Sequence, residues 1–487
     1  MSNYIGDIIP IINLQKNVLI FGRGGTGKTY LLRELAVELK KQGYCLACTA
    51  TTGIAAISLQ NHEEGIISRT LHSWGGVGFC QGSAEELTKN IIKYSKVRQR
   101  WCDIEVLIID EISMMGADFF DKLDYIAKHV RGNSKPFGGI TLVLCGDFLQ
   151  LPPVNDRWIF ESESYKELSL NIIELNVPYR YKDEKYFSIL TRVRRGKPND
   201  NDIAILQSRV DAYEKWLKKN QGKTDIIKPT ILFSRKIDVN TYNMKELDKL
   251  PGKAWVSKAY DFYEGKKGAP KASIKDYKRN LDDMIDEVIT LKIGAQVMLR
   301  VNLDTENALV NGSRGVIINM ETIVEGDFDD ENETETAFKK LLLKQLAQSG
   351  RNEPIMKVTV KFKHCEIAIP ISNFRFDDDK GKAIRCQIPL ILAWATTIHK
   401  CQGLTLDSCL ADLGESVFIH AQSYTALSRV RDLESLFLSR LHPPCITADP
   451  KALEYNDMLK KKYREDLIKS MSIEEKNTVF VFDDSNV

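Results

Sequence analysis

A glycine-rich stretch near the start of the chain has the residue types that bind phosphate. Residues 22–29 satisfy the pattern G-x-x-x-x-G-K-[ST], directly after a short apolar run and before apolar residues at helical spacing. Glycines let backbone N–H groups close around a phosphate, and the start of a helix adds the positive end of its dipole. We expect Lys28 to contact the β- and γ-phosphates of a nucleotide and Thr29 to bind Mg²⁺. The remaining predicted cofactor-binding residues of this loop are Gly22, Gly24, Gly25, Thr26 and Gly27.

Two adjacent carboxylates follow a second apolar run. Residues 106–109 are apolar, and Asp110 and Glu111 come directly after them. An acid at the carboxyl end of a buried strand holds the metal in enzymes with this type of loop, so Asp110 is the second predicted Mg²⁺ ligand. Glu111 can orient and deprotonate a water molecule, which favours hydrolysis over transfer to another acceptor. The alternative is an exposed acidic pair at a strand end, and the phosphate-binding loop argues against it.

Three more polar residues are candidates for contacts with the transferred phosphoryl group. Gln150 follows an apolar run and precedes two prolines, so we expect it at the carboxyl edge of the same sheet. Arg180 and Arg429 are candidates for the cation that stabilises charge on the phosphoryl oxygens. Taken alone, either arginine would be expected at the surface. The predicted catalytic residues are therefore Lys28, Glu111, Gln150, Arg180 and Arg429.

The order of apolar runs predicts the fold that positions these residues. Predicted strands alternate with helical stretches up to residue 160, which indicates an α/β domain with a parallel sheet covered on both faces; the strands are expected at 17–21, 44–50, 106–109 and 140–145. Residues 160–198 have a mostly helical pattern. Strand signals return at 229–233 and 389–393 with β-like runs between them, so we expect a second α/β domain with a β-rich insertion.

Composition excludes several classes of protein. The chain has 487 residues, a formal net charge of +2 and no apolar run long enough for a membrane span, and its start lacks a basic leader. Ten scattered cysteines fit a reducing compartment, so we expect a soluble, intracellular protein without a targeting segment. Cys45 and Cys48 are expected on one strand, where positions three apart point to opposite faces, so buried thiols are favoured over a zinc or redox pair. The seven carboxylates within 325–335 predict a solvated loop, and residues 480–484 a loose end.

Seven segments, taken in order, resemble the motifs of superfamily-one helicases. Within that superfamily the chain is similar to the Pif-one and RecD branch, and residues 121–123, Arg131 and residues 136–140 resemble the signature of the Pif-one family between its second and third motifs. The resemblance covers about residues 17–440. The seven segments are 22–29, 49–56, 70–74, 110–115, 146–153, 395–405 and 424–431.

The resemblance implies two RecA-like P-loop domains with parallel sheets, and a small β-barrel of the Src-homology-three type inserted in the second. On this basis the first RecA-like, ATP-binding domain is 1–160. Connecting helices and the first part of the second RecA-like domain occupy 161–315. The β-rich insertion with its acidic loop is 316–385, the end of the second RecA-like domain is 386–445, and a C-terminal helix and tail occupy 446–487.

The resemblance also implies an activity. A member of this family would be an ATP-dependent DNA helicase that uses ATP and Mg²⁺, moves 5′ to 3′ on single-stranded DNA and unwinds forked duplexes in replication, repair or recombination. We expect a monomer with no membrane partner, while G-quadruplex DNA and RNA–DNA hybrids stay open as substrates. The alternatives are an RNA or RNA–DNA hybrid unwinder, or a DNA-binding scaffold that does not hydrolyse ATP.

Further site residues follow from the matching motifs. Gly403 is expected at the nucleotide. The predicted nucleic-acid-binding residues are Thr51, Thr52, His72, Trp74, Thr397, His399 and Lys400, because hydroxyls and amides can hold phosphates and aromatic rings can stack on bases. For Trp74 the alternative is a core aromatic.

The chain departs from the family at several positions. In the family, an L-x-x-x-Q element upstream of the loop contacts adenine. Residues 1–14 do not contain a convincing match to this element, so the choice of nucleotide is open. Arg23 and Gly25 replace the usual Pro and Ala, and Tyr181 follows Arg180 where Gln is usual. None of these changes removes a charge or a metal ligand.

Overall fold

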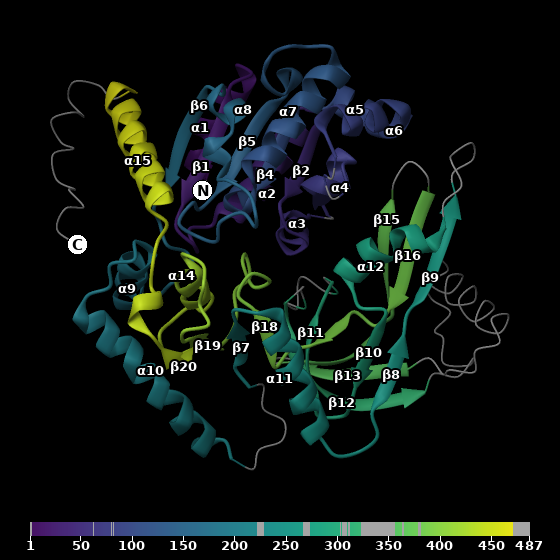
Figure 1. Ribbon diagram of the computed structural model, residues 1–487, viewed down its shortest axis with the longest axis vertical. Coiled ribbons are helices and arrows are strands. Elements are labelled where there is room, and N and C mark those ends of the chain that lie inside the picture. The colour runs from purple at the N-terminus through teal and green to yellow at the C-terminus, as the bar shows by residue number, and fades with distance from the viewer. Residues whose placement is uncertain are drawn as a thin grey trace. The chain divides into compact units, whose positions relative to one another are not determined.

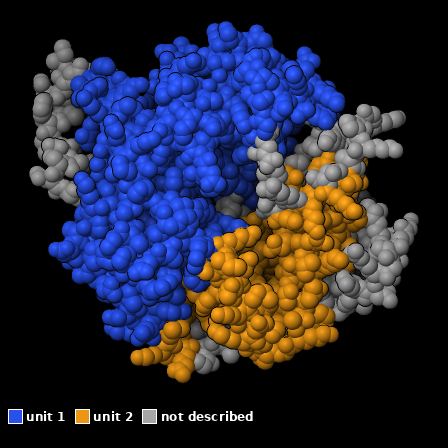
Figure 2. Space-filling model, viewed as in Figure 1, with its two compact units in different colours: residues 1–215, 232–235, 397–487 blue, residues 216–231, 236–396 orange. Residues whose placement is uncertain are grey.

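The computed structural model describes residues 2–470 except 62, 79, 81, 222–227, 266–272, 302, 304–308, 310–311, 323–355, 363–364 and 378–380. The acidic run 325–335 and the tail residues 480–484 lie outside the described residues. The chain forms two compact units (Figure 2): unit 1 is residues 1–215, 232–235 and 397–487, and unit 2 is residues 216–231 and 236–396. Residues 397–487 belong to the same compact unit as residues 1–215.

A six-stranded parallel sheet is the centre of unit 1 (Figure 1), and its strand order is β3-β2-β4-β5-β1-β6. The predicted parallel α/β sheet is confirmed. Its strands are β1 (Asn17–Gly22), β2 (Leu46–Ala50), β3 (Ser68–Thr70), β4 (Val106–Asp110), β5 (Thr141–Gly146) and β6 (Leu170–Leu175).

Helices cover both faces of this sheet because its strands are apolar on both sides. Along β1, Val18 and Ile20 pack in one core cluster and Leu19 and Phe21 in the other. The first cluster includes residues of α1 (Ser2–Asn13), α2 (Lys28–Lys41) and α3 (Gly53–Leu59). The second includes residues of α4 (Leu71–Gly75), α5 (Ala84–Lys93), α6 (Ser95–Asp103), α7 (Ala117–Arg131), α8 (Glu163–Lys166) and α15 (Pro450–Ser470).

The remaining elements of unit 1 come from later parts of the chain. Strand β19 (Cys409–Leu413) pairs in parallel with β20 (Leu436–Leu441), and α14 (Gln422–Leu427) lies between them in sequence. Helix α9 (Glu184–Arg194) contacts α14. The chain passes from one unit to the other within α10 (Asp200–Lys219), within β7 (Thr230–Phe233), directly before Lys236 and within β18 (Ala395–Thr397).

Unit 2 is built mainly from antiparallel strands. A five-stranded sheet has the order β14-β13-β12-β11-β17, and smaller sheets pair β10 with β8 and β15 with β16 and β9. The bounds are β8 (Trp255–Lys258), β9 (Tyr260–Gly265), β10 (Val288–Leu291), β11 (Gln296–Leu299), β12 (Arg314–Thr322), β13 (Met356–Phe362), β14 (Glu366–Ile369), β15 (Ser372–Asp377), β16 (Gly381–Gln387) and β17 (Leu390–Leu392). Its helices are α11 (Lys236–Lys249) and α12 (Lys278–Met284).

Three expectations about local structure need correction. Residues 160–198 contain the strand β6, which pairs with β1, so the helical interpretation of this segment is wrong in part. The strand expected at 389–393 is β17, and it pairs antiparallel with β11 instead of joining a parallel sheet. Cys48 is buried and burial raises its pKa to about 12, whereas Cys45 is exposed and lies just before β2.

Candidate nucleotide site

The phosphate-binding loop connects β1 to α2, as the sequence predicts. Gly25 and Gly27 have positive φ values of 84° and 80°, a conformation that glycine adopts without strain. The Lys28 ammonium donates hydrogen bonds of 2.9 Å to the carbonyl oxygens of Gly22 and Arg23. The lysine is therefore held against the loop that begins its own motif, at the N-terminus of α2.

Thr29 and Asp110 meet at the carboxyl end of β4. The Thr29 hydroxyl donates to Oδ2 of Asp110 at 2.8 Å, and the backbone N–H of Glu111 donates to Oδ1 at 2.8 Å. Burial and the neighbouring Glu111 raise the pKa of Asp110 to about 6. A hydroxyl and a carboxylate side by side fit Mg²⁺, which takes one or two protein ligands together with water and phosphate oxygens. A cation would also offset the cost of an ionised carboxylate at this buried position.

Glu111 is fixed by residues from two other parts of unit 1. Its backbone is left-handed, with a φ of 57°. Its carboxylate Oε2 accepts a 2.9 Å hydrogen bond from Nε2 of Gln402, and its backbone oxygen accepts one of 2.9 Å from the hydroxyl of Thr51. A methyl group added at Gly403 would lie 3.5 Å from Oε1. The carboxylate that would take the proton of water is therefore bordered by residues of the segment 395–405.

Gln402 is a residue that the sequence analysis missed. It is 2% exposed, and its oxygen Oε1 has no hydrogen-bond partner among the described residues. Its amide also lies 3.4 Å from the hydroxyl of Ser113. The signal was its place in the motif 395–405, directly before Gly403, but nothing in the sequence paired it with Glu111.

Three side chains surround Gly24 of the loop. A methyl group at Gly24 would lie 3.0 Å from Nε2 of Gln150, 3.3 Å from the hydroxyl of Tyr424 and 3.7 Å from Nη2 of Arg429. Gln150 is 3% exposed, and its Oε1 has no partner among the residues that the structure describes. The structure thus brings Gln150 and Arg429 to the phosphate-binding loop, as expected, and it adds Tyr424.

Both candidate arginines approach the same turn. Nη1 of Arg180 donates to the carbonyl oxygen of Ser428 at 2.8 Å, and the backbone N–H of Arg180 donates to Gly25 at 3.0 Å. Burial and the charge of Arg429 lower the pKa of Arg180. Arg429 is 1% exposed, so the expectation of a surface position does not hold for it. Its guanidinium donates to Thr425 O at 2.7 Å and to the hydroxyl of Ser428 at 2.6 Å.

The residues predicted to face DNA lie in three segments of the chain: residues 51–52, helix α4 and residues 397–400. Thr51 contacts Glu111, and Thr52 caps α3 by accepting from the N–H of Ala55 at 3.2 Å. In the segment 397–400, the hydroxyl of Thr397 accepts a hydrogen bond from the backbone N–H of Lys400 at 3.2 Å. Lys400 is exposed, and burial lowers the pKa of His399. Thr51 and the segment that contains Gln402 meet at Glu111.

The side chains on α4 behave differently from that group. The His72 ring stacks on Phe119 at a centroid distance of 4.2 Å, and burial lowers its pKa. Trp74 is 5% exposed and packs against Trp101 at 4.6 Å within the core of unit 1. The predicted DNA contact of Trp74 is therefore corrected to a core position, since stacking on a base would remove the ring from its apolar surroundings.

Clusters of metal-binding side chains and membrane-spanning helices are two further features that would bear on function. In the described part of the chain, no group of three or more His, Cys, Asp or Glu side chains is placed to hold a metal ion. Likewise, none of the helices in the described ranges combines the length and the apolar character needed to cross a bilayer.

Comparisons with known proteins place the chain in a family. A model described as PIF1-like helicase matches residues 5–219, and a model of the 2B domain of DNA helicase Pif1 matches residues 280–320. The chain is 35% identical over 458 residues to the ATP-dependent DNA helicase PIF1 of Xenopus laevis, which covers 92% of this chain and 62% of that protein. It is 34% identical to the uncharacterized protein 030L of Invertebrate iridescent virus 6, with 91% and 92% covered.

A solved structure agrees with these matches along nearly all of its length. The crystal structure of Pif1 helicase from Candida albicans is 30% identical, with a TM-score of 0.73, and the match covers 94% of this chain and 99% of that one. The chain spans about three fifths of the length of the curated PIF1 relatives, 62% for the Xenopus laevis and human proteins. The chain therefore belongs to the PIF1-like helicase family, the Pif-one family that its motifs resemble.

Proposed function

We propose that the chain is an ATP-dependent DNA helicase that moves along single-stranded DNA. The observation that carries this proposal is that Gln150 and Arg429 lie at Gly24 of the loop that ends in Lys28 and Thr29, while Asp110, the neighbour of Glu111, accepts a hydrogen bond from Thr29. The family supports it, because the curated relatives are named ATP-dependent DNA helicases. A movement from 5′ to 3′ and a role in replication, repair or recombination are part of the proposal.

The hydrolytic step assigns one task to each group. Lys28 binds the β- and γ-phosphates, and Thr29 and Asp110 would hold Mg²⁺, which supplies positive charge at the phosphate oxygens when it is bound. Water attacks the γ-phosphorus, its proton goes to the Glu111 carboxylate, and the bond from that phosphorus to the bridging oxygen of ADP breaks. Gln150 contacts the γ-phosphate, while Arg180 and Arg429 stabilise the charge on its oxygens. Gly403 lies at the nucleotide.

We also propose a finer description of the fold. The parallel sheet of unit 1 that carries the phosphate-binding loop would be the first RecA-like domain, and the pair β19 and β20 would belong to the second. The small Src-homology-three-like barrel would lie among the antiparallel strands of unit 2, which supply the short paired strands that such a barrel requires.

The DNA contacts follow from residue types that bind phosphate without reading sequence. Thr51, Thr52, His72, Thr397, His399 and Lys400 would contact single-stranded and forked DNA, and the enzyme would act as a monomer. Thr51 and Gln402 both bond to Glu111, so a strand bound at either segment would act on the carboxylate that activates water. This arrangement supports hydrolysis stimulated by DNA.

One experiment tests the proposal against its rivals. ATPase activity is measured with single-stranded DNA, with RNA and with neither, followed by unwinding of duplexes that have a 5′ or a 3′ tail. We expect stimulation by DNA and unwinding of the 5′-tailed duplex. Stimulation by RNA alone would identify an RNA unwinder, and DNA binding without hydrolysis would identify a scaffold; either result would contradict the proposal.

A further inference from the structure

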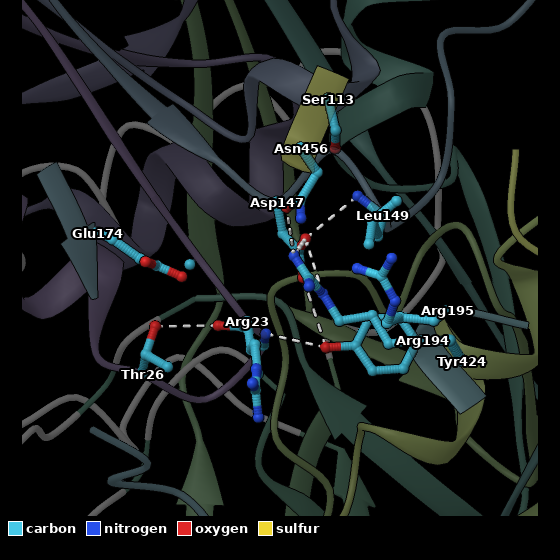
Figure 3. Close-up of polar contacts among 12 residues, drawn as sticks. Arg23, Thr26, Ser113, Asp147, Leu149, Glu174, Arg194, Arg195, Tyr424 and Asn456 are labelled. Atoms are coloured by element: carbon cyan, nitrogen blue, oxygen red, sulfur yellow. Dashed lines mark hydrogen bonds and ion pairs between the residues drawn. The ribbon is translucent and has the colours of Figure 1, made fainter. Parts of the chain in front are cut away.

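Tyr424 is a buried residue of α14 whose hydroxyl contacts the phosphate-binding loop. The hydroxyl accepts a 3.0 Å hydrogen bond from the backbone N–H of Gly24 and lies 3.4 Å from Oδ2 of Asp147. Figure 3 shows the Tyr424 hydroxyl directed toward both the loop at Arg23 and the carboxylate of Asp147. A phenol has one hydrogen, so it accepts from the loop and donates to the carboxylate.

Asp147 is a charged acceptor, although it is buried. Burial raises its pKa, but the charge and hydrogen bonds of Arg194 outweigh burial and lower it overall. The two side chains meet at 2.5 Å between Nη2 of Arg194 and Oδ1 of Asp147. Burial, with the charge of Asp147 adding to it, raises the pKa of Tyr424, so the phenol keeps its hydrogen. The hydroxyl therefore donates to an ionised carboxylate, across a long contact of 3.4 Å.

The same contacts continue to the C-terminal helix. Nη2 of Arg194 donates to Oδ1 of Asn456 in α15 at 3.1 Å. Asn456 is 0% exposed, and Figure 3 places it beside Asp147 and Arg194. Gly24, Tyr424, Asp147, Arg194 and Asn456 thus form a continuous series of polar contacts from the loop to α15, and we call these five residues the Tyr424 series.

The position of the series suggests what it does. Residues 22–29 include four glycines, and a chain rich in glycine loses much conformational entropy when it is fixed around a phosphate. A hydrogen bond that holds Gly24 in place lowers this cost, because the loop is already ordered when the nucleotide binds. The effect belongs to nucleotide affinity and not to the rate of the chemical step.

We propose that Tyr424 is a positioning residue of the nucleotide site, which orders the phosphate-binding loop through Gly24, and that Asp147, Arg194 and Asn456 connect this function to α15. The inference rests on the proposed function, since it deepens the account of the same site. In this proposal neither Tyr424 nor Asn456 contacts the reacting atoms of ATP and water.

The test compares two tyrosines that differ in their partner. Tyr424→Phe removes only the hydroxyl. We expect the dissociation constant of the protein for fluorescently labelled ADP, measured in the presence of Mg²⁺, to rise about 5- to 10-fold, the scale of one hydrogen bond. The KM for ATP should rise by a similar factor, while kcat at saturating ATP and DNA changes less than about 2-fold. A variant that was merely less folded would lose kcat and keep KM. The control is Tyr186→Phe, because that buried hydroxyl donates to Leu427 O at 2.5 Å and not to the loop.

The connection to α15 is tested by a second pair of variants. Asn456→Ala should raise the same dissociation constant. Asp457→Asn removes the ion pair with Arg195 near the surface but keeps a side-chain oxygen for the contact with Asn456, so it should leave the constant nearly unchanged. The double variant of Tyr424→Phe and Asn456→Ala should weaken binding less than the product of the two single effects.

The outcomes separate this inference from the proposed function. Equal affinities of the Tyr424→Phe variant and the parent would overturn the inference while the parent still hydrolyses ATP. A loss confined to kcat would also overturn it, and strictly multiplicative effects in the double variant would overturn the connection to α15. A parent that neither binds labelled ADP nor hydrolyses ATP would instead contradict the proposed function.

Discussion

Asp110 is a carboxylate whose buried position opposes its ionised form. Its pKa is raised to about 6 from an ordinary value of 3.8, so the folded state binds more protons than the unfolded state between these values. The contribution of Asp110 to the free energy of unfolding is therefore fully present below about pH 4 and is lost as the pH rises through 6. The difference of about two pKa units corresponds to roughly 3 kcal/mol at most.

This sign leads to a prediction for Asp110→Asn. In the presence of EDTA at pH 8, the free energy of unfolding of the variant should exceed that of the parent by up to about 3 kcal/mol, because the variant has no charge to bury. The difference should shrink toward zero near pH 4. Urea unfolding at a series of pH values measures it, and added Mg²⁺ should stabilise only the parent. A variant less stable than the parent at pH 8 would show that Thr29 and the N–H of Glu111 already compensate the charge.

Lys28 offers a second prediction, with a matched control on the same helix. Lys28→Ala should abolish ATPase activity and leave the fold intact, because the ammonium contacts only the carbonyl oxygens of Gly22 and Arg23 among its hydrogen-bond partners in the described residues. Lys40 also donates to two carbonyl oxygens, those of Glu64 and Gly65, but is exposed. Lys40→Ala should therefore keep its activity. Turnover by a folded Lys28→Ala variant would refute the assignment of the nucleotide site.

Among the elements, the turn after α14 carries two arginines in different surroundings. Helix α14 ends at Leu427, and neither Arg429 nor Arg431 is helical. Arg429 is buried against the loop and Arg431 is exposed, so we predict different effects of substitution at the two positions.

Arg429→Ala should lower the ATPase rate by about 10³-fold at saturating single-stranded DNA, as for other arginines that stabilise a transferred phosphoryl group. Arg431→Ala should change it little. Arg429→Lys keeps the charge but not the planar fork, and should remain well below the parent. Steady-state turnover is compared with DNA binding in the absence of nucleotide, which should be retained. Equal losses at both positions would mean that the turn acts through folding.

Elements with a strong local pattern could be predicted from the sequence. The strand β1, the loop and α2 follow each other within 25 residues, and their apolar spacing and glycines identify them directly. β6 was missed because it is an edge strand whose sequence includes Asn171 and Glu174 among apolar residues. Trp74 could not be placed from sequence, since only its contact with Trp101 distinguishes a core ring from a stacking one.

The parts of the site that could not be predicted depend on contacts between distant residues. Gln402 reaches Glu111 across 291 positions, and Asn456 reaches Arg194 across 262. No local pattern records such pairs, because each residue taken alone is an ordinary polar side chain. A resemblance to a family identified the motifs, but the partner of each residue came from the fold.

At the scale of the whole molecule, binding to DNA should depend on salt and ignore sequence. The net charge is only +2, so attraction must come from local groups such as Lys400 and the hydroxyls near it. Affinities for single strands of equal length and mixed sequence, measured over a salt series, should fall together on a log–log plot. A preference above about 10³-fold for one sequence would contradict this expectation, since that is the lower limit for specific duplex readers.

The contact between Gly24 and Tyr424 also has a consequence for how the protein is made. These residues are 400 positions apart, so at about 5–20 residues per second the ribosome needs roughly 20–80 s to add the second after the first. During that interval a nascent chain carries a phosphate-binding loop without Gln402, Tyr424 or Arg429. An interrupted translation product therefore has the loop and lacks the groups that complete it, so we expect a prematurely terminated fragment not to hydrolyse ATP.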